Sequence, residues 1–155
     1  MDDVDRFEES KNRALFLRFI SRLRNSAKRV ADQLGHRERE AVYQRALAAE
    51  FEALGYTSEC EYPVSVVYQT SDGRQITLAH ERADIAVRLP SGLIIVEVKR
   101  GAQLPALVKE GLEQSRRYAS HLSRAGQNVA GVCSIAFNKH KGHPQQSQLQ
   151  EMWQL

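Results

Sequence analysis

Apolar residues in the first part of the chain recur at helical spacing. Residues 8–33 carry an apolar stripe with basic positions between its members, which predicts an amphipathic helix that packs on the rest of the domain or on a partner chain. The stripe consists of Leu15, Phe19, Leu23 and Val30. Gly35 interrupts the pattern, and a second helix is predicted over His36–Leu54. It ends at Gly55, because glycine readily adopts the left-handed conformation that follows many helices.

After the second helix the pattern changes to short β-rich runs bounded by turn residues. The turns fall at Ser-Asp-Gly (71–73) and Pro-Ser-Gly (90–92). The predicted strands are Val64–Tyr68, Arg74–Ala79, Ala83–Leu89, Leu93–Lys99 and Val129–Phe137. Helical spacing from Leu104 to Leu122, with Pro105 in the first turn and Gly126 after the end, predicts a third helix before the last strand. This order indicates an α/β fold with a mixed central sheet flanked by helices and an extra N-terminal amphipathic helix.

The chain divides by pattern into three segments. Residues 1–34 are expected to form a basic N-terminal helical arm, 35–138 the main domain, and 139–155 a Gln/His-rich C-terminal tail. The tail is expected to be flexible up to Leu149, after which Met152 and Trp153 can dock on the domain. We find no internal repeat and no linker rich in proline or glycine that would separate two domains.

Composition excludes several classes of protein. The hydrophobic share of 42% and charged share of 26% are ordinary for a globular domain, and no apolar run approaches the roughly 20 residues that a membrane span needs. The acidic N-terminus does not resemble a secretory signal. Cys60 and Cys133 lie far apart and read as reduced core residues. We therefore expect an intracellular protein, cytoplasmic or associated with the nucleus or nucleoid, with no membrane partner.

The net charge of +3 is modest, but its distribution suggests a nucleic-acid partner. Residues 11–29 contain seven basic side chains and no acid, and Lys139–Lys141 adds a second cluster. Such clusters attract a phosphate backbone. For either cluster taken singly, a solvated helix face or tail is the favoured alternative. The side chains predicted to contact nucleic acid from the first helix are Arg18, Arg22, Lys28 and Arg29.

Two carboxylates are expected to face each other across the 90–92 turn. If that hairpin is centred between Pro90 and Ser91, paired positions sum to 181, so Asp84 lies opposite Glu97. Like charges directly opposed on a sheet destabilise it, and a divalent cation offsets the repulsion. Two carboxylates plus waters are ligands that Mg²⁺ prefers.

Lys99 is expected on the same face as Glu97, because strand residues two apart point the same way. It can position a nucleophilic water or neutralise charge at a phosphate, whereas the alternative is a simple ion pair with Glu97 or Asp84. The apolar run Leu93–Val96 favours a site, because charges that end a strand buried on both faces need a partner or a ligand.

Two helices can add further groups. Glu40 is expected on a core-facing stripe of the second helix, where a role near a metal is weighed evenly against an exposed glutamate at the edge of the stripe, paired with Arg37 or Arg45. Gln114 and Tyr118 are one helical turn apart and can point at the same end of the sheet. Ordinary helix surface and core is the favoured alternative for them.

Four segments together resemble a known family. The E-x-x-Y-x-x-A-L pattern from Glu40 to Leu47, the R-A-D segment at 82–84, the V-E-x-K segment at 96–99 and the Q-x-x-x-Y pattern at 114–118 resemble the GxxExxY proteins. These proteins are a branch of the PD-(D/E)XK nuclease superfamily. The strand at 131–138 resembles the family's closing segment only loosely, and Arg37 stands where the family signature has its first glycine.

The resemblance implies a restriction-endonuclease-like core and a phosphodiesterase site. It implies Asp84 and Glu97 as ligands of Mg²⁺ or Mn²⁺, with the backbone carbonyl of Val98 as a further ligand. Lys99 would assist the attacking water, Glu40 would support the metal or its waters, and Gln114 would be an auxiliary residue.

Three functions fit these observations. The first is a metal-dependent nuclease that hydrolyses DNA or RNA with low sequence specificity, since backbone contacts position but do not specify sequence. The second is a non-catalytic nucleic-acid-binding or structural subunit of a larger assembly that retains the nuclease fold. Such a subunit, or a homo-oligomer, would use the N-terminal helix for its contacts. The third is a subunit-interaction module that does not touch nucleic acid.

Overall fold

A computed structural model describes residues 2–142 and 146–153 of the chain. Three helices and five strands follow one another in this part of the chain. The helices are α1 (Asp3–Leu34), α2 (Glu40–Ala53) and α3 (Leu104–Arg124). The strands are β1 (Thr57–Gln69), β2 (Gln75–Leu89), β3 (Gly92–Gly101), β4 (Val129–Asn138) and β5 (Ser147–Trp153).

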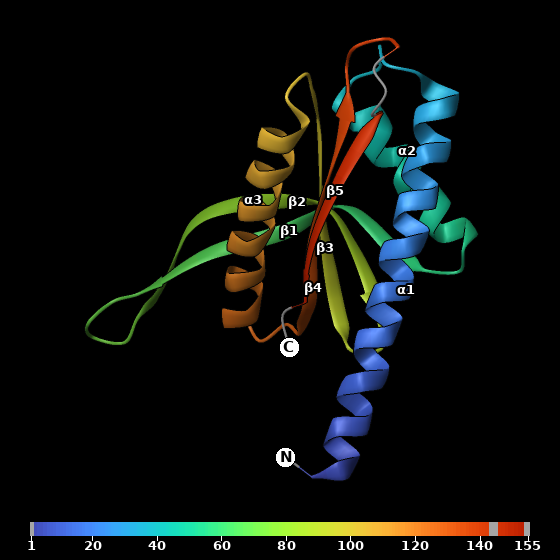
Figure 1. Cartoon of the computed structure of the whole chain (residues 1–155). Helices are drawn as coiled ribbons and strands as arrows, with labels where there is room; N and C mark the ends of the chain where they lie inside the picture. The colour runs from blue at the N-terminus through green and yellow to red at the C-terminus, as the bar shows by residue number, and fades with distance from the viewer. Residues whose placement is uncertain (1, 143–145, 154–155) are drawn as a thin grey trace.

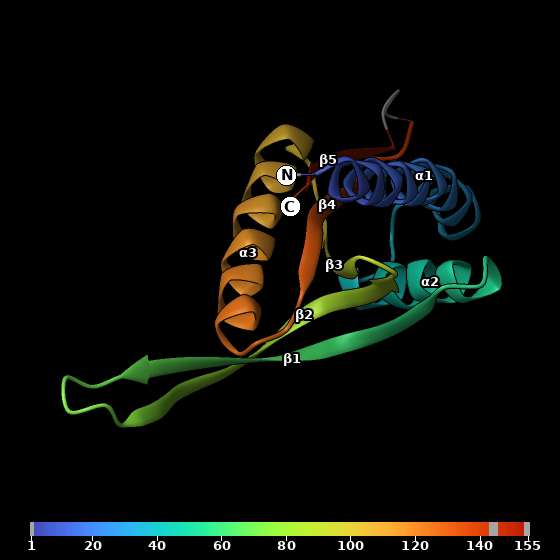
Figure 2. The same cartoon turned by 90° about the horizontal axis from the view of Figure 1, so that it is seen from below.

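The strands form one mixed sheet in the order β1-β2-β3-β4-β5. β3 and β4 are parallel because α3 connects them, and the other neighbours are antiparallel. α3 covers one face of the sheet, and α1 and α2 cover the other (Figure 2). This confirms the predicted α/β fold with a mixed sheet flanked by helices and an additional N-terminal helix.

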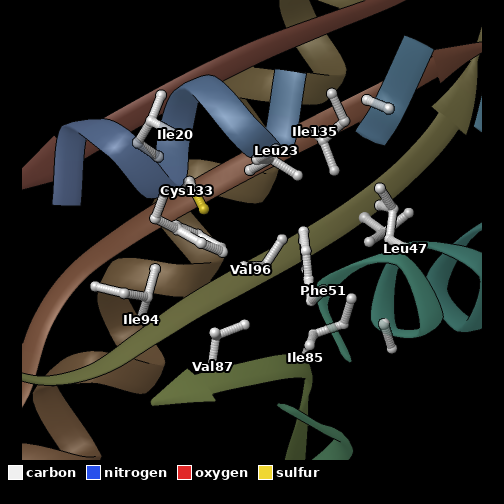
Figure 3. Packing of buried hydrophobic residues seen from close by; sticks show 14 of the residues in the cluster. Ile20, Leu23, Leu47, Phe51, Ile85, Val87, Ile94, Val96, Cys133 and Ile135 are labelled. Carbon is white, nitrogen blue, oxygen red and sulfur yellow. The ribbon is translucent and has the colours of Figure 1, made fainter. Parts of the chain in front are cut away.

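The larger core lies between the sheet and the α1–α2 pair. Side chains from both helices meet Ile85, Val87, Ile94 and Val96 of the central strands (Figure 3). The buried stripe of α1 includes Phe19, Leu23 and Val30 as predicted, whereas Leu15 lies at its edge and Phe16 and Ile20 are buried. The stripe therefore packs on the chain's own sheet.

The two ends of the chain contribute to this core. Phe16 of α1 packs against Trp153 of β5, with ring centroids 5.1 Å apart, and Met152 packs against the smaller core under α3. The predicted docking of Met152 and Trp153 is confirmed. Part of the expected flexible tail, residues 143–145, lies outside the described residues. The division into arm, domain and tail stays a prediction.

Several element boundaries differ from the prediction. α1 begins at Asp3, where the Asp2 side chain accepts a hydrogen bond from the Asp5 N–H and caps the helix. α2 begins four residues later than expected, because the carbonyls of Gly35 and His36 accept hydrogen bonds from the side chains of Tyr43 and Arg100.

The sheet is also more extensive than predicted. β2 runs without a break from Gln75 to Leu89, since its polar middle at 80–82 continues to pair with β1. Residues 147–153 form a strand on β4, although the sequence pattern predicted no strand there. The β1–β2 hairpin projects past α3, away from the body (Figures 1 and 2). Among the described residues, no helix is both long and apolar enough to span a membrane. Cys60 and Cys133 are both free.

Candidate functional site

Asp84 and Glu97 meet at the point where the β2–β3 ladder ends. The register runs from Leu89↔Gly92 to Ile85↔Val96, so paired positions sum to the predicted 181. At the next step the two carboxylates accept the backbone hydrogen bonds. Glu97 Oε1 accepts from the Asp84 N–H at 3.0 Å, and Asp84 Oδ2 accepts from the Val98 N–H at 2.8 Å. Each carboxylate keeps one oxygen outside these two bonds.

The pair is electrostatically strained. Glu97 is only 2% exposed and Asp84 is partly buried. Burial first, and then the negative charge of Asp84, raises the pKa of Glu97 from 4.5 to about 9, although the charge of Lys99 acts in the opposite direction. Two adjacent carboxylates in such a place favour a bound cation or a retained proton.

Lys99 is held by α3. Its Nζ donates to Gln114 Oε1 at 2.9 Å, and Gln114 Nε2 donates to the Tyr118 hydroxyl at 2.9 Å. Glu110 Oε1 lies 3.8 Å from the same Nζ. Among the described residues Lys99 forms no ion pair with Glu97 or Asp84, the alternative that the strand pattern left open. The lysine is therefore directed by the amide of Gln114 at hydrogen-bond distance and by a longer ion pair with the exposed Glu110.

Gly111 explains how α3 comes close enough to hold Lys99. A Cβ at this position would lie 2.1 Å from Ser134 Oγ of β4 and 3.5 Å from the Lys99 side chain. The absence of a side chain lets the helix lie directly on the strands. The sequence pattern did not single out either Gly111 or Ser134, because their contact joins positions far apart in the chain.

Glu40 lies at the first turn of α2, within electrostatic range of the site, but the residue is exposed, so its expected place on a core-facing stripe is wrong. Partial burial of its carboxyl group raises the pKa of Glu40, the charge of Lys99 lowers it and the charge of Asp84 raises it, and a backbone hydrogen bond from Arg100 lowers it. Among the described residues no ion pair joins Glu40 to Arg37 or Arg45. The structure thus brings Glu40, Asp84, Glu97, Lys99, Gln114 and Tyr118 to one end of the sheet.

Gln44 and Glu61 also contact the site, and the sequence pattern missed both. Gln44 is buried, and its Nε2 donates to the Asp84 carbonyl at 2.8 Å and to Glu61 Oε1 at 3.0 Å. Glu61 has a φ of 54°, which residues other than glycine rarely adopt. It lies beside Asp84, between the pairs Cys60↔Ile85 and Tyr62↔Ala83. The position of Gln44 on the buried stripe of α2 could have indicated a role in the site. No feature of the sequence indicates the backbone conformation of Glu61.

Of the four basic side chains of α1 predicted to contact nucleic acid, two have partners within the chain and two are exposed. Arg22 donates to the Tyr56 hydroxyl at 3.0 Å, and Arg29 pairs with Glu50 at 3.1 Å, so both hold α1 against its neighbours. Arg18 and Lys28 are exposed. A nucleic-acid contact by these four residues stays a prediction.

The donors available to a metal are few. Among the described residues no three His, Cys, Asp or Glu side chains gather closely enough to hold an ion. The predicted set consists of two carboxylates, from Asp84 and Glu97, with the Val98 carbonyl. It would rely on water for the remaining ligands.

Comparison with known proteins agrees with this geometry. A family profile described as the PD-(D/E)XK nuclease superfamily matches residues 18–145, which include every residue of the site. A search of curated proteins finds no significant match. The mixed sheet, the abutting aspartate and glutamate and the neighbouring lysine, together with this match over most of the sequence, establish that the chain belongs to the PD-(D/E)XK nuclease superfamily.

Proposed function

We propose that this protein is a metal-dependent nuclease of the GxxExxY branch that hydrolyses phosphodiester bonds in DNA or RNA with low sequence specificity. The observation that carries the proposal is a pair of hydrogen bonds from backbone to carboxylate: the Asp84 N–H donates to Glu97, and the Val98 N–H donates to Asp84. These bonds hold two carboxylates together at the end of a buried strand, beside Lys99. Such an arrangement has no evident structural benefit, because removing either charge would relieve the repulsion.

The residues fit a hard divalent cation. Asp84 and Glu97 each have one oxygen outside the backbone hydrogen bonds, and the raised pKa of Glu97 reflects burial and an adjacent negative charge that a cation would offset. Asp84, Glu97 and the Val98 carbonyl would hold Mg²⁺ or Mn²⁺, with Glu40 supporting the ion or its waters. When bound, the ion would supply Lewis acidity toward the scissile phosphate.

Lys99 would orient the attacking water or neutralise charge that develops on the phosphate. Gln114 accepts a hydrogen bond from its ammonium group at 2.9 Å, which fixes the direction of Nζ without neutralising its charge. Tyr118 in turn holds Gln114. In this proposal Gln114 is an auxiliary residue that positions Lys99. Tyr118 is only 5% exposed and supports Gln114, so it has little surface for the predicted contact with nucleic acid.

A structural role in a larger assembly is the second candidate. One observation favours it: the first turns of α1 extend beyond the sheet (Figure 1), and they expose Val4 and Phe7 at 69% and 68%. Exposed apolar side chains on a projecting helix suit a contact with another subunit or a second copy. The same surface is compatible with catalysis at the other end of the molecule.

Calorimetric titration of Mg²⁺ and Mn²⁺, with plasmid nicking measured on the same samples, tests the proposal. We expect the wild type to bind metal and to nick, and Asp84→Asn to lose both, since asparagine keeps the acceptor for Val98 but removes the charge. Glu52→Gln, which neutralises an exposed carboxylate of α2, is the matched control and should behave as wild type. Absence of metal binding by the wild type would reject the enzymatic proposal and leave the structural candidate.

A further inference from the structure

The second half of α3 is basic and largely unneutralised. From Gln114 to Gln150 the sequence contains no aspartate or glutamate, while α3 carries Arg116, Arg117 and Arg124 in this stretch. Arg117 pairs with Glu81 at 2.8 Å. Among the described residues neither Arg116 nor Arg124 forms an ion pair, and both are exposed. Both are therefore available to an anionic ligand.

This basic surface begins at the candidate site. Tyr118, which holds Gln114 and through it Lys99, lies under the Arg117 guanidinium at 5.0 Å from its ring centre. Arg116, Arg117 and Arg124 line one hollow on the exposed side of the same helix, and Arg124 lies nearly two turns beyond Tyr118. Positive charge therefore continues along α3 away from the carboxylates, which is the distribution that a phosphate chain entering the site would encounter.

The projecting hairpin provides a second wall beside this helix. A surface cavity of about 620 Å³ lies between the hairpin and the end of α3. Tyr68, Gln69 and Gln75 line it from the hairpin, and His121 and Arg124 line it from the helix. Both views show the hairpin passing α3 and extending beyond it (Figures 1 and 2).

The chemistry of the hairpin suits bases more than phosphates. Tyr68 is 56% exposed, and Ile76 and Leu78 are exposed near it. The charges at the tip neutralise each other, because Arg74 Nε pairs with Asp72 Oδ2 at 3.0 Å. Aromatic side chains beside a basic groove are the usual platform for single strands, whose bases are free to stack. A duplex keeps its bases stacked inside, so it would present no free base on which Tyr68 could stack.

We propose that the C-terminal half of α3 and the β1–β2 hairpin form a track for single-stranded nucleic acid that leads to the Asp84–Glu97 site. Arg116 and Arg124 bind phosphates, and Tyr68 stacks on a base. The inference rests on the proposed nuclease function for the direction of the track, but the binding itself requires neither metal nor cleavage.

Equilibrium binding of a fluorescent thymidine oligonucleotide in EDTA tests the track at several salt concentrations. We expect Arg116→Gln/Arg124→Gln to weaken binding about tenfold and to reduce the slope of log affinity against log salt by about 1 to 1.5, because each phosphate contact on a single strand contributes about 0.7. Tyr68→Ala should weaken binding without changing the salt slope. Tyr68→Phe should bind with the affinity of the wild type. Thermal melts show whether each variant is folded.

The matched control is Arg45→Gln/Arg88→Gln, which removes two exposed charges from α2 and β2. We expect it to bind as the wild type does. Loss of binding in Arg18→Gln/Lys28→Gln, with none in the α3 variant, would overturn the track and place the interface on α1. Equal affinity for a duplex of the same length, or no effect of Tyr68→Ala, would overturn the single-strand assignment. Oligonucleotide binding that depends on α3, in a chain that binds no metal and nicks no plasmid, would reject the nuclease function and leave the track standing.

Discussion

The backbone N–H of Asp84 donates a 3.0 Å hydrogen bond to the carboxylate of Glu97. The Asp84 carboxylate in turn accepts from the residue after Glu97, Val98, at 2.8 Å. Two acids thereby close the end of a β ladder in place of two backbone carbonyls. The arrangement fixes their positions in a buried place, where burial first and then the charge of Asp84 raise the pKa of Glu97 to about 9. The stability of the metal-free protein should depend on this relationship.

Glu97 predicts a loss of stability with rising pH in EDTA. The folded-state pKa of Glu97 is raised above the ordinary 4.5. The contribution of Glu97 to the free energy of unfolding is therefore fully present below pH 4.5 and is lost as pH rises through about 9. Glu97→Gln removes this dependence and should be more stable than wild type toward pH 9, by about 1 kcal/mol or more, which is a rise in Tm of about 2–4 °C. Thermal melts across this pH range measure it. Parallel Tm profiles for the two proteins would contradict the prediction.

Lys99 predicts a separation of metal binding from cleavage. Lys99→Met should lower the rate of nicking by about a hundredfold or more, a typical contribution of a positioned proton-transfer or charge-stabilising group. Metal affinity should fall little or not at all, because Lys99 does not supply a ligand. Calorimetry and nicking rates at saturating metal distinguish the two. Gln114→Met should give a smaller loss of rate, since the charge remains but its direction is less restricted. A nicking rate unchanged in Lys99→Met would remove the lysine from the reaction.

Gly111 and Ser134 predict a paired effect on stability. Gly111→Ala places a Cβ 2.1 Å from Ser134 Oγ, so the Ser134 side chain must rotate or α3 must move away from β4, at a cost of about 1–3 kcal/mol despite the better helix propensity of alanine. Ser134→Ala alone should be close to neutral, because this buried hydroxyl has no hydrogen-bond partner among the described residues. The double variant should recover part of the loss. Denaturant unfolding of the four proteins provides the thermodynamic cycle, and additive effects would show that the two positions do not interact.

The hydrogen bond from Gln44 to the Asp84 carbonyl predicts that a residue outside the proposed ligands controls the geometry of Asp84. Gln44→Met keeps the volume but leaves the Asp84 carbonyl and Glu61 carboxylate without their donor, which should cost about 1–3 kcal/mol. Weaker metal binding than wild type should accompany this loss at temperatures where the variant is folded. Gln33→Met, at an exposed position of α1, is the control for the chemical change. Metal affinity equal to that of wild type would limit Gln44 to a structural role.

The elements of this fold could be predicted because their signals are local. Helical spacing indicated α1, α2 and α3, and turn residues at 71–73 and 90–92 indicated the two hairpins. The strand formed by residues 147–153 escaped prediction, because Gln148 and Gln150 give it a polar composition and only its pairing with β4 makes it a strand. The start of α2 at Glu40 was also not predicted. The carbonyls of Gly35 and His36 accept hydrogen bonds from the side chains of Tyr43 and Arg100, which are tertiary contacts.

The sequence by itself determined the register that joins Asp84 to Glu97, and the alternation that places Lys99 on the same face as Glu97. The tight turn at 90–92 sets the register, and the two-residue period of a strand sets the alternation. Only the tertiary structure decided that Gln114 directs Lys99, that Gln44 and Glu61 support Asp84, and that Gly111 admits α3 to the sheet. Those contacts join residues far apart along the chain. They form only when the helices pack on the sheet, so no local spacing records them.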